Sequence, residues 1–173
     1  MRIAIILFIL AAILLAGGFY AYTSAPPEAN AATALIVPGV SAVILITLGL
    51  LLMAASARGR TVAARRLHIA GMVLALAYAA AFAHRAQAAG VEVRAHEEAA
   101  SQFEELVGEG LEENTEENRR AFFEELEAPQ YSKAYLTGTL WTLSGFAFVT
   151  FLALLFTRPG KPAPSPSPSP SAE

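Results

Sequence analysis

The chain alternates long apolar blocks with short polar connections. Four blocks are long enough to cross a lipid bilayer as helices, which takes roughly 20 mostly apolar residues. They cover residues 1–22, 34–55, 67–88 and 134–157. Lipid offers no hydrogen bonds to backbone N–H and C=O groups, so each block must satisfy these groups internally, as an α-helix does. The pattern therefore predicts an all-α fold: a polytopic helical membrane bundle with four transmembrane helices.

The first block has a second interpretation, as a secretory signal peptide. Arg2 precedes the apolar run and small residues precede Pro26, as around a signal-peptide cleavage site. The apolar run is longer than the core of a usual signal peptide. We therefore favour an uncleaved helix that acts as a signal anchor. Cleavage stays open as the alternative, and it would leave the orientation of the other blocks unchanged.

Acidic residues gather in the connection between the third and fourth blocks. Thirteen of the fifteen acidic residues lie between Glu92 and Glu127, and the chain contains no Asp. We call residues 92–130 the acidic segment. The acidic segment is interrupted by Gly108 and Gly110, and Pro129 lies near its end. Glycine and proline are helix terminators, so this spacing predicts two short helices.

Each predicted helix of the acidic segment has a start signal and an apolar stripe. Ser101 and Thr115 have the spacing of helix N-caps, and Phe103 and Phe123 stand on apolar stripes with helical periodicity. We therefore expect an extramembrane acidic helical hairpin inserted between the third and fourth transmembrane helices.

Four glutamates raise the question of a metal or catalytic site, namely Glu112, Glu113, Glu116 and Glu117. A di-iron bundle needs Glu-x-x-His pairs on facing helices, and a calcium loop needs Asp or Asn oxygens at alternate positions. The chain has neither pattern and contains no Cys. Because Glu is a good helix former, we interpret the glutamates as a solvated helical surface, with weak cation binding as the alternative. We predict no enzyme, and no catalytic, cofactor or metal site.

Arginines predict the orientation of the bundle. The connection between the second and third blocks carries Arg58, Arg60, Arg65 and Arg66, whereas the connection between the first and second carries no Arg or Lys. Short connections rich in Lys and Arg stay in the cytoplasm. We therefore expect a multi-pass protein of a bacterial-type plasma membrane, with both termini in the cytoplasm and the acidic segment outside.

Small residues recur along the second, third and fourth blocks. Those that we predict to mediate helix packing are Gly39, Gly49, Gly71, Ala75, Ala79, Ala83, Gly138, Thr142 and Gly145. Small residues let membrane helices approach closely, and bundle packing is the interpretation that we favour. The alternative is a sliding interface for a transported molecule.

After the last block, residues 158–173 form a Pro-Ser repeat. Such a composition cannot form a core and favours an extended, disordered C-terminal tail. No stripe of Lys and Arg with interleaved aromatic residues is present. Nucleic acid is therefore not an expected partner.

Several short patterns are shared with a known family. They are Gly17, Gly18 and Tyr22 at the end of the first block, Gly39 in the second, Arg85 in the third, and Ser132, Lys133 and Gly138 leading into the fourth. In these residues the chain resembles the transmembrane protein 14 family of small four-helix membrane proteins. The insertion between Gln87 and Gln130 and the Pro-Ser tail depart from that family's compact pattern. Some members are implicated in moving fatty acids or porphyrin precursors across organelle membranes, so the resemblance implies a lipid-like cargo.

Two functions fit the sequence. We favour a non-enzymatic scaffold or accessory protein whose acidic segment contacts a partner. The alternative is a small carrier for a lipid-like or amphipathic molecule. Carriers usually show polar residues within the membrane or broken helices, and here the polarity inside the blocks is mostly Ser and Thr hydroxyl. The expected partners are the lipid bilayer and either another membrane protein or a second copy of the chain in a homo-oligomer.

Overall fold

A computed structural model describes residues 2–26 and 31–157, and in this part of the chain all regular secondary structure is α-helical. The helices are α1 (Arg2–Thr23), α2 (Ala32–Ala57), α3 (Thr61–Gly108), α4 (Glu116–Glu125) and α5 (Ala134–Phe156). Four of them, α1, α2, α3 and α5, are long and apolar enough to cross a membrane. The predicted all-α fold with four candidate spans is therefore confirmed. The predicted tail, residues 158–173, lies outside the described residues.

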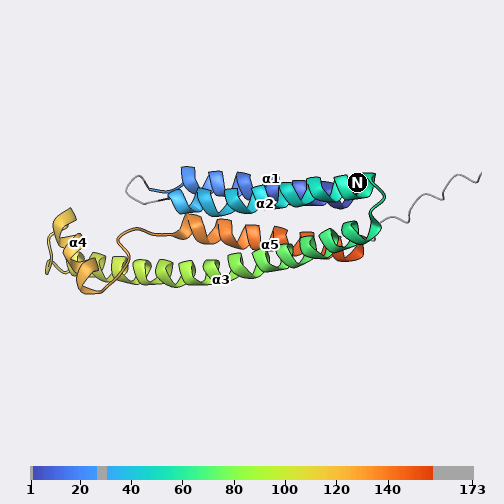
Figure 1. Cartoon of the computed structure of the whole chain (residues 1–173). Coiled ribbons are helices and arrows are strands. Elements are labelled where there is room, and N and C mark those ends of the chain that lie inside the picture. The colour runs from blue at the N-terminus through green and yellow to red at the C-terminus, as the bar shows by residue number, and fades with distance from the viewer. Residues whose placement is uncertain (1, 27–30, 158–173) are drawn as a thin grey trace, which may run out of the picture.

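The four long helices form two antiparallel pairs that lie side by side (Figure 1). Helix α1 packs chiefly on α2, and α3 packs chiefly on α5, with smaller contacts of α1 on α5 and of α2 on α3. Large buried side chains fill the space between the helices, including Leu7, Leu10, Leu14, Leu45 and Leu154. The core is therefore aliphatic and runs along the length of the bundle.

The outward surface of the long helices is apolar as well. Val43, Val73 and Val149 are each more than 60% exposed, and they lie on three different helices. A helix that is apolar on all sides suits either a large core or a membrane. Because these side chains are exposed in a small bundle, lipid contact explains them best.

Helix α3 is one uninterrupted helix of 48 residues. The sequence pattern predicted a transmembrane helix ending at residue 88 and a separate helix capped by Ser101. That separation is wrong, because Ser101 lies inside α3. The physical reason is that residues 85–107 are mostly good helix formers, and the single Gly90 costs only about 1 kcal/mol, too little to break the helix. The predicted stop at Gly108 is confirmed.

Helix α4 begins where its cap predicted. The Thr115 side chain accepts a hydrogen bond from the backbone N–H of Asn118 at 3.2 Å. Phe123 is fully buried against α3, where its ring lies 5.3 Å from the ring of His96. The rings of Phe103 and Phe122 make a second contact, with centroids 5.6 Å apart. A small aromatic cluster therefore holds α4 on the C-terminal part of α3.

Three helices end in the same hydrogen-bond pattern. At the end of α2, Arg60 N–H bonds Ala55 O and Gly59 N–H bonds Ser56 O. These are the two bonds of a Schellman motif, which places one residue in the left-handed region. That residue is Gly59 after α2 and Gly110 after α3, but it is Glu127 after α4, with a φ of 52°. Glycine adopts this conformation freely, whereas a side chain makes it strained.

Candidate functional site

A cavity of about 600 Å³ lies between the two helix pairs, at the end of the bundle where α1 ends and α2 and α5 begin. We call this end the cavity end, and the opposite end, where Arg58–Arg66 connect α2 to α3, the arginine end (Figure 1). The cavity is lined by residues of α1, α2, α3 and α5 and by residues 129–133. Its size is within the usual range for small-molecule sites.

The deep wall of the cavity is apolar and depends on two glycines of α1. A Cβ atom on Gly17 would come within 2.7 Å of Leu143 Cδ2 on α5. A Cβ atom on Gly18 would come within 3.0 Å of the backbone oxygen of Ala34 on α2. Both glycines line the cavity. Their missing side chains let α1 approach both neighbours at this end and leave the wall smooth and apolar.

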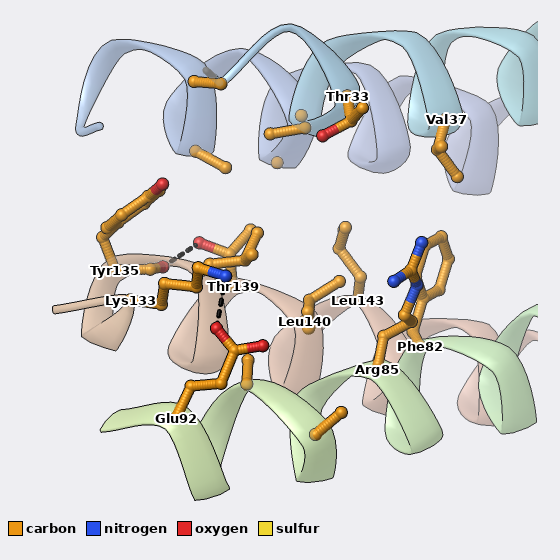
Figure 2. A pocket seen from close by; sticks show the side chains of 18 of the residues that line it. Thr33, Val37, Phe82, Arg85, Glu92, Lys133, Tyr135, Thr139, Leu140 and Leu143 are labelled. Atoms are coloured by element: carbon orange, nitrogen blue, oxygen red, sulfur yellow. Dashed lines mark hydrogen bonds and ion pairs between the residues drawn. The ribbon is translucent and has the colours of Figure 1, made fainter. Parts of the chain in front are cut away.

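Charged residues lie at the polar side of the cavity. Arg85 and Glu92 are seven residues apart on α3, a spacing that places them on one face of the helix. Figure 2 shows Arg85 beside Phe82, with its guanidinium directed into the space between the helix pairs. Glu92 forms an ion pair with Lys133, whose side chain projects from the start of α5 (Figure 2). Because this pair is neutral as a unit, Arg85 gives the described wall of the cavity a net positive charge.

Residues 129–133, which we call the strap, cover one side of the cavity, and all five line it. Its first two residues, Pro129 and Gln130, are also the last two of the acidic segment, and hydrogen bonds attach them to α3 and α4. His96 Nδ1 on α3 donates a 2.8 Å hydrogen bond to the carbonyl oxygen of Pro129. Gln130 Nε2 donates to the carbonyl oxygen of Arg120 on α4 at 3.1 Å. The acidic segment and the cavity are therefore parts of one connected structure.

Thr139 is the buried hydroxyl of the cavity wall. Its Oγ1 donates a 2.8 Å hydrogen bond to the carbonyl oxygen of Tyr135, one turn earlier on α5. Tyr135 also lines the cavity, and Figure 2 shows both side chains beside Lys133. The hydroxyl is satisfied within its own helix, so it can accept a further hydrogen bond from a ligand without a rearrangement.

The small residues predicted to mediate packing divide into two groups. Gly49, Gly71, Ala75 and Ala79 are buried among the helices. A Cβ on Gly49 would lie 2.5 Å from the Phe8 ring, and one on Gly71 would lie 3.3 Å from Leu7. These glycines therefore let α2 and α3 approach α1. Ala83 is half-buried at the cavity end of α3.

The other predicted packing residues do not meet a neighbouring helix of this chain. Gly138, Thr142 and Gly145 are exposed on α5, and no atom lies within 4 Å of a Cβ built on either glycine. The same open space surrounds Gly39 on α2. Their role in packing stays a prediction, and the packing would have to be against another molecule. On α5, it is Ser144 that faces α3, where its Oγ donates to Ala79 O at 2.8 Å.

The four residues predicted to determine topology, Arg58, Arg60, Arg65 and Arg66, are all exposed at the arginine end. Near them, buried His68 donates from Nε2 to the carbonyl oxygen of Leu154 at 2.9 Å, which joins α3 to α5. The glutamates of interest, Glu112, Glu113, Glu116 and Glu117, are exposed in or before α4. Within residues 2–26 and 31–157, no three His or Glu side chains come together to hold a metal ion.

Sequence reasoning missed the charged cluster of the cavity. Arg85 was placed in the third block, Glu92 in the acidic segment and Lys133 before the fourth block, so the three were not grouped. The signal was the seven-residue spacing of Arg85 and Glu92, which is informative only if α3 continues through both positions. Because we expected a helix end at residue 88, the two side chains were not placed on one face.

Comparison with protein-family models, with curated proteins and with solved structures returns no match. The resemblance to the transmembrane protein 14 family is therefore not tested and stays a prediction. Five of the residues on which it rests, Gly17, Gly18, Arg85, Ser132 and Lys133, line the cavity.

Proposed function

We propose that this chain is a non-enzymatic, multi-pass membrane protein that binds an amphipathic, lipid-like molecule in the cavity between its two helix pairs. The observation that carries the proposal is the pairing of an apolar wall with Arg85 in one cavity at the end of the bundle. An intramembrane or boundary cation beside a cavity is the usual mark of a ligand or substrate path. The sequence alone favoured a scaffold. Because of the cavity, we now favour a carrier or binding function over a scaffold.

The orientation that we propose follows the arginine asymmetry. The arginine end faces the cytoplasm, both chain termini lie on that side, and the acidic segment lies outside the membrane on the other side. The cavity then lies at the outer boundary of a plasma membrane of bacterial type. An amphipathic ligand would place its polar end near Arg85 and its chain against the Gly17 and Gly18 wall.

The size and charge of the cavity narrow the class of ligand. A volume of about 600 Å³ is typical of small-molecule sites, and a single-chain amphiphile is the ligand class that we propose. The net positive charge of the described wall favours an anionic polar end, because the Arg85 guanidinium can form a charge-assisted hydrogen bond with it.

The test is to identify the molecules that co-purify with the protein in mild detergent, by mass spectrometry. Arg85→Gln should lower the retained anionic amphiphile roughly tenfold, since a charge-assisted hydrogen bond is worth about 1.5–3 kcal/mol. Arg94→Gln is the matched control, because Arg94 is exposed on the same helix and does not line the cavity. Equal retention of the amphiphile by both variants would show that Arg85 does not bind it.

A second pair of variants fills the cavity without changing its charge. Val37 points from α2 into the cavity (Figure 2), so Val37→Trp should exclude the ligand. Val43→Trp is the control, because Val43 is 63% exposed on the same helix and lies outside the cavity. We expect ligand loss with the first variant only, and full retention by the filled cavity would contradict a binding site here.

A scaffold or accessory role is the second candidate, and the exposed surface of the acidic segment favours it. The carboxylates of Glu112, Glu113, Glu116 and Glu117 are all solvent-exposed on or before α4, so they are accessible to a basic partner. Their joint replacement by Gln should abolish recovery of such a membrane-protein partner from cross-linked membranes. Retention of the ligand by that quadruple variant would separate this role from the cavity.

A further inference from the structure

The arginine end contains a second concave surface, remote from the cavity. A shallow depression is lined by Gly59, Arg60, Thr61, Val62, Ala63, Arg66 and Leu67, at the start of α3. Arg58, Arg60, Arg65 and Arg66 are all exposed there, but only Arg60 and Arg66 line the depression. Among the residues that the structure describes, the ion pair joins Glu92 to Lys133. No described carboxylate therefore neutralises any of these four arginines.

The local geometry places cationic and apolar groups side by side. Val62 and Arg66 are four residues apart on α3, as are Ala63 and Leu67, so all four share one helix face. Arg60, the residue before the helix, closes the depression on its other side. Val62 is 66% exposed and, together with Leu67, gives the depression an apolar rim.

The backbone at this position adds donors that lack an acceptor within the helix. Helix α3 has no side-chain cap at its start and no acidic residue in its first turn. The first N–H groups of a helix have no intrahelical partner and favour negative charge. Val62 and Ala63 supply such groups at the wall of the depression. Two arginines, an apolar rim and the free amides of a helix start all line one depression, and this combination is complementary to a phosphate.

We infer that the depression at the arginine end binds the phosphate head group of an anionic membrane lipid. Arg60 and Arg66 bind the phosphate oxygens, and Val62 and Leu67 contact the first methylenes of the acyl chains. The apolar rim is the reason to choose a lipid over free phosphate, because an inorganic ion gains nothing from it. Basic residues next to transmembrane helices attract anionic lipids. Of the four arginines at this end, only Arg60 and Arg66 line the depression. This site is independent of the proposed ligand cavity.

The test compares two double variants of equal net charge in purified full-length protein. Lipid binding is measured by native mass spectrometry in detergent during titration with phosphatidylglycerol, with phosphatidylcholine as the uncharged reference. Arg60→Gln with Arg66→Gln should weaken phosphatidylglycerol binding roughly 10- to 30-fold, from roughly fivefold for each arginine near the surface. Arg58→Gln with Arg65→Gln should weaken it less than about threefold. Phosphatidylcholine binding should be unchanged in both.

Equal losses in the two double variants would overturn the site, because net charge alone would then explain binding. The choice of a lipid over free phosphate as the ligand is tested separately by adding inorganic phosphate in large excess. Displacement of phosphatidylglycerol by phosphate would show that the apolar rim contributes nothing and would overturn a lipid-specific site. The detergent assay does not depend on membrane orientation, so a variant that inserts in reverse still gives a valid result. If a double variant unfolds, phosphatidylglycerol binding by the single variants Arg60→Gln and Arg66→Gln is compared with binding by Arg58→Gln.

Discussion

Glycines let helices approach closely toward both ends of the bundle, but the two ends differ in the space that remains between the helix pairs. Toward the arginine end, Gly49 and Gly71 remove side chains where Phe8 and Leu7 need the room, and the helix pairs close on one another. At the cavity end, Gly17 and Gly18 also allow close approach of α1 to its neighbours, yet a cavity of about 600 Å³ opens beside them. The difference lies in what the facing helices supply. Leu and Phe side chains line both regions, but the cavity is also lined by Arg85, Glu92 and Lys133, whereas the glycines of the closed end face Phe8 and Leu7.

This comparison shows that a small-residue stripe does not by itself identify a packed interface. Of the nine residues predicted to mediate packing, those on α3 are buried or half-buried, while those on α5 face outward. The small residues on α5 recur at intervals of four and three and those on α3 at intervals of four, so each set lies on one face of its helix. Only the identity of the opposite residues decides which stripe meets a helix of the same chain, and spacing along one helix does not contain that information.

The largest expected effect concerns which end faces the cytoplasm. The native chain has no Cys, so single cysteines report position without background. Glu113→Cys in the acidic segment should react fully with a membrane-impermeant thiol reagent in intact cells, while Thr61→Cys at the arginine end should not react, because the arginine-rich connection stays inside. Both positions are exposed in the structure. Labelling of Thr61→Cys alone would reverse the orientation of the two ends.

The next largest effect tests the closed part of the bundle. Gly49→Leu should lower the free energy of unfolding by about 1–3 kcal/mol, the usual cost of overpacking, because a Cβ there already meets the Phe8 ring at 2.5 Å. The measurement is thermal unfolding in detergent. Gly39→Leu is the matched control on the same helix, since no atom lies within 4 Å of its Cβ position. Similar losses from both would mean that the glycines of α2 act through backbone flexibility and not through packing.

A smaller effect compares the same turn at the two ends. Gly59 closes α2 at the arginine end, and Glu127 closes α4 just before the strap, both in the left-handed region. Glu127→Gly should stabilise α4 on α3 by up to about 1 kcal/mol, because a left-handed side-chain residue costs roughly 1–2 kcal/mol and glycine regains most of it. Hydrogen exchange of the acidic segment should slow by up to about fivefold.

The converse substitution provides the control for that prediction. Gly59→Glu places the same side chain in the same kind of turn at the arginine end, so it should destabilise the bundle by a similar amount. Faster exchange in Glu127→Gly would show that the Glu127 side chain makes a contact worth more than the strain.

The smallest effect lies between the two ends, in the hydroxyl groups of α5. Ser144 donates to Ala79 O on α3, whereas Thr142 donates to Gly138 O in its own helix. Hydrogen bonds between membrane helices average about 0.6 kcal/mol, so Ser144→Ala should lower stability by about that amount. Thr142→Ala should change it by less, as measured by thermal unfolding under the same conditions. A larger loss from Thr142→Ala would place a partner on the exposed face of α5.

The sequence was sufficient to predict the four long helices, the cap at Thr115 and the helix stop at Gly108, because each depends on local composition. It was not sufficient for the continuity of α3. The change from apolar to acidic residues and the cap signal at Ser101 suggested a boundary, but the residues there are mostly good helix formers and α3 continues through them. The cavity could not be predicted, because Arg85 and Glu92 on α3 and Lys133 before α5 line one space only after the helix pairs assemble.

The unbroken length of α3 has a mechanical consequence. Its last 20 residues extend about 30 Å past the predicted boundary at residue 88, at 1.5 Å for each residue. A helix without a hinge behaves as a stiff rod, so a tilt of about 5° inside the bundle displaces the far tip by roughly 2–3 Å over that length. A small change in how α3 packs within the bundle therefore becomes a larger displacement at its C-terminal tip.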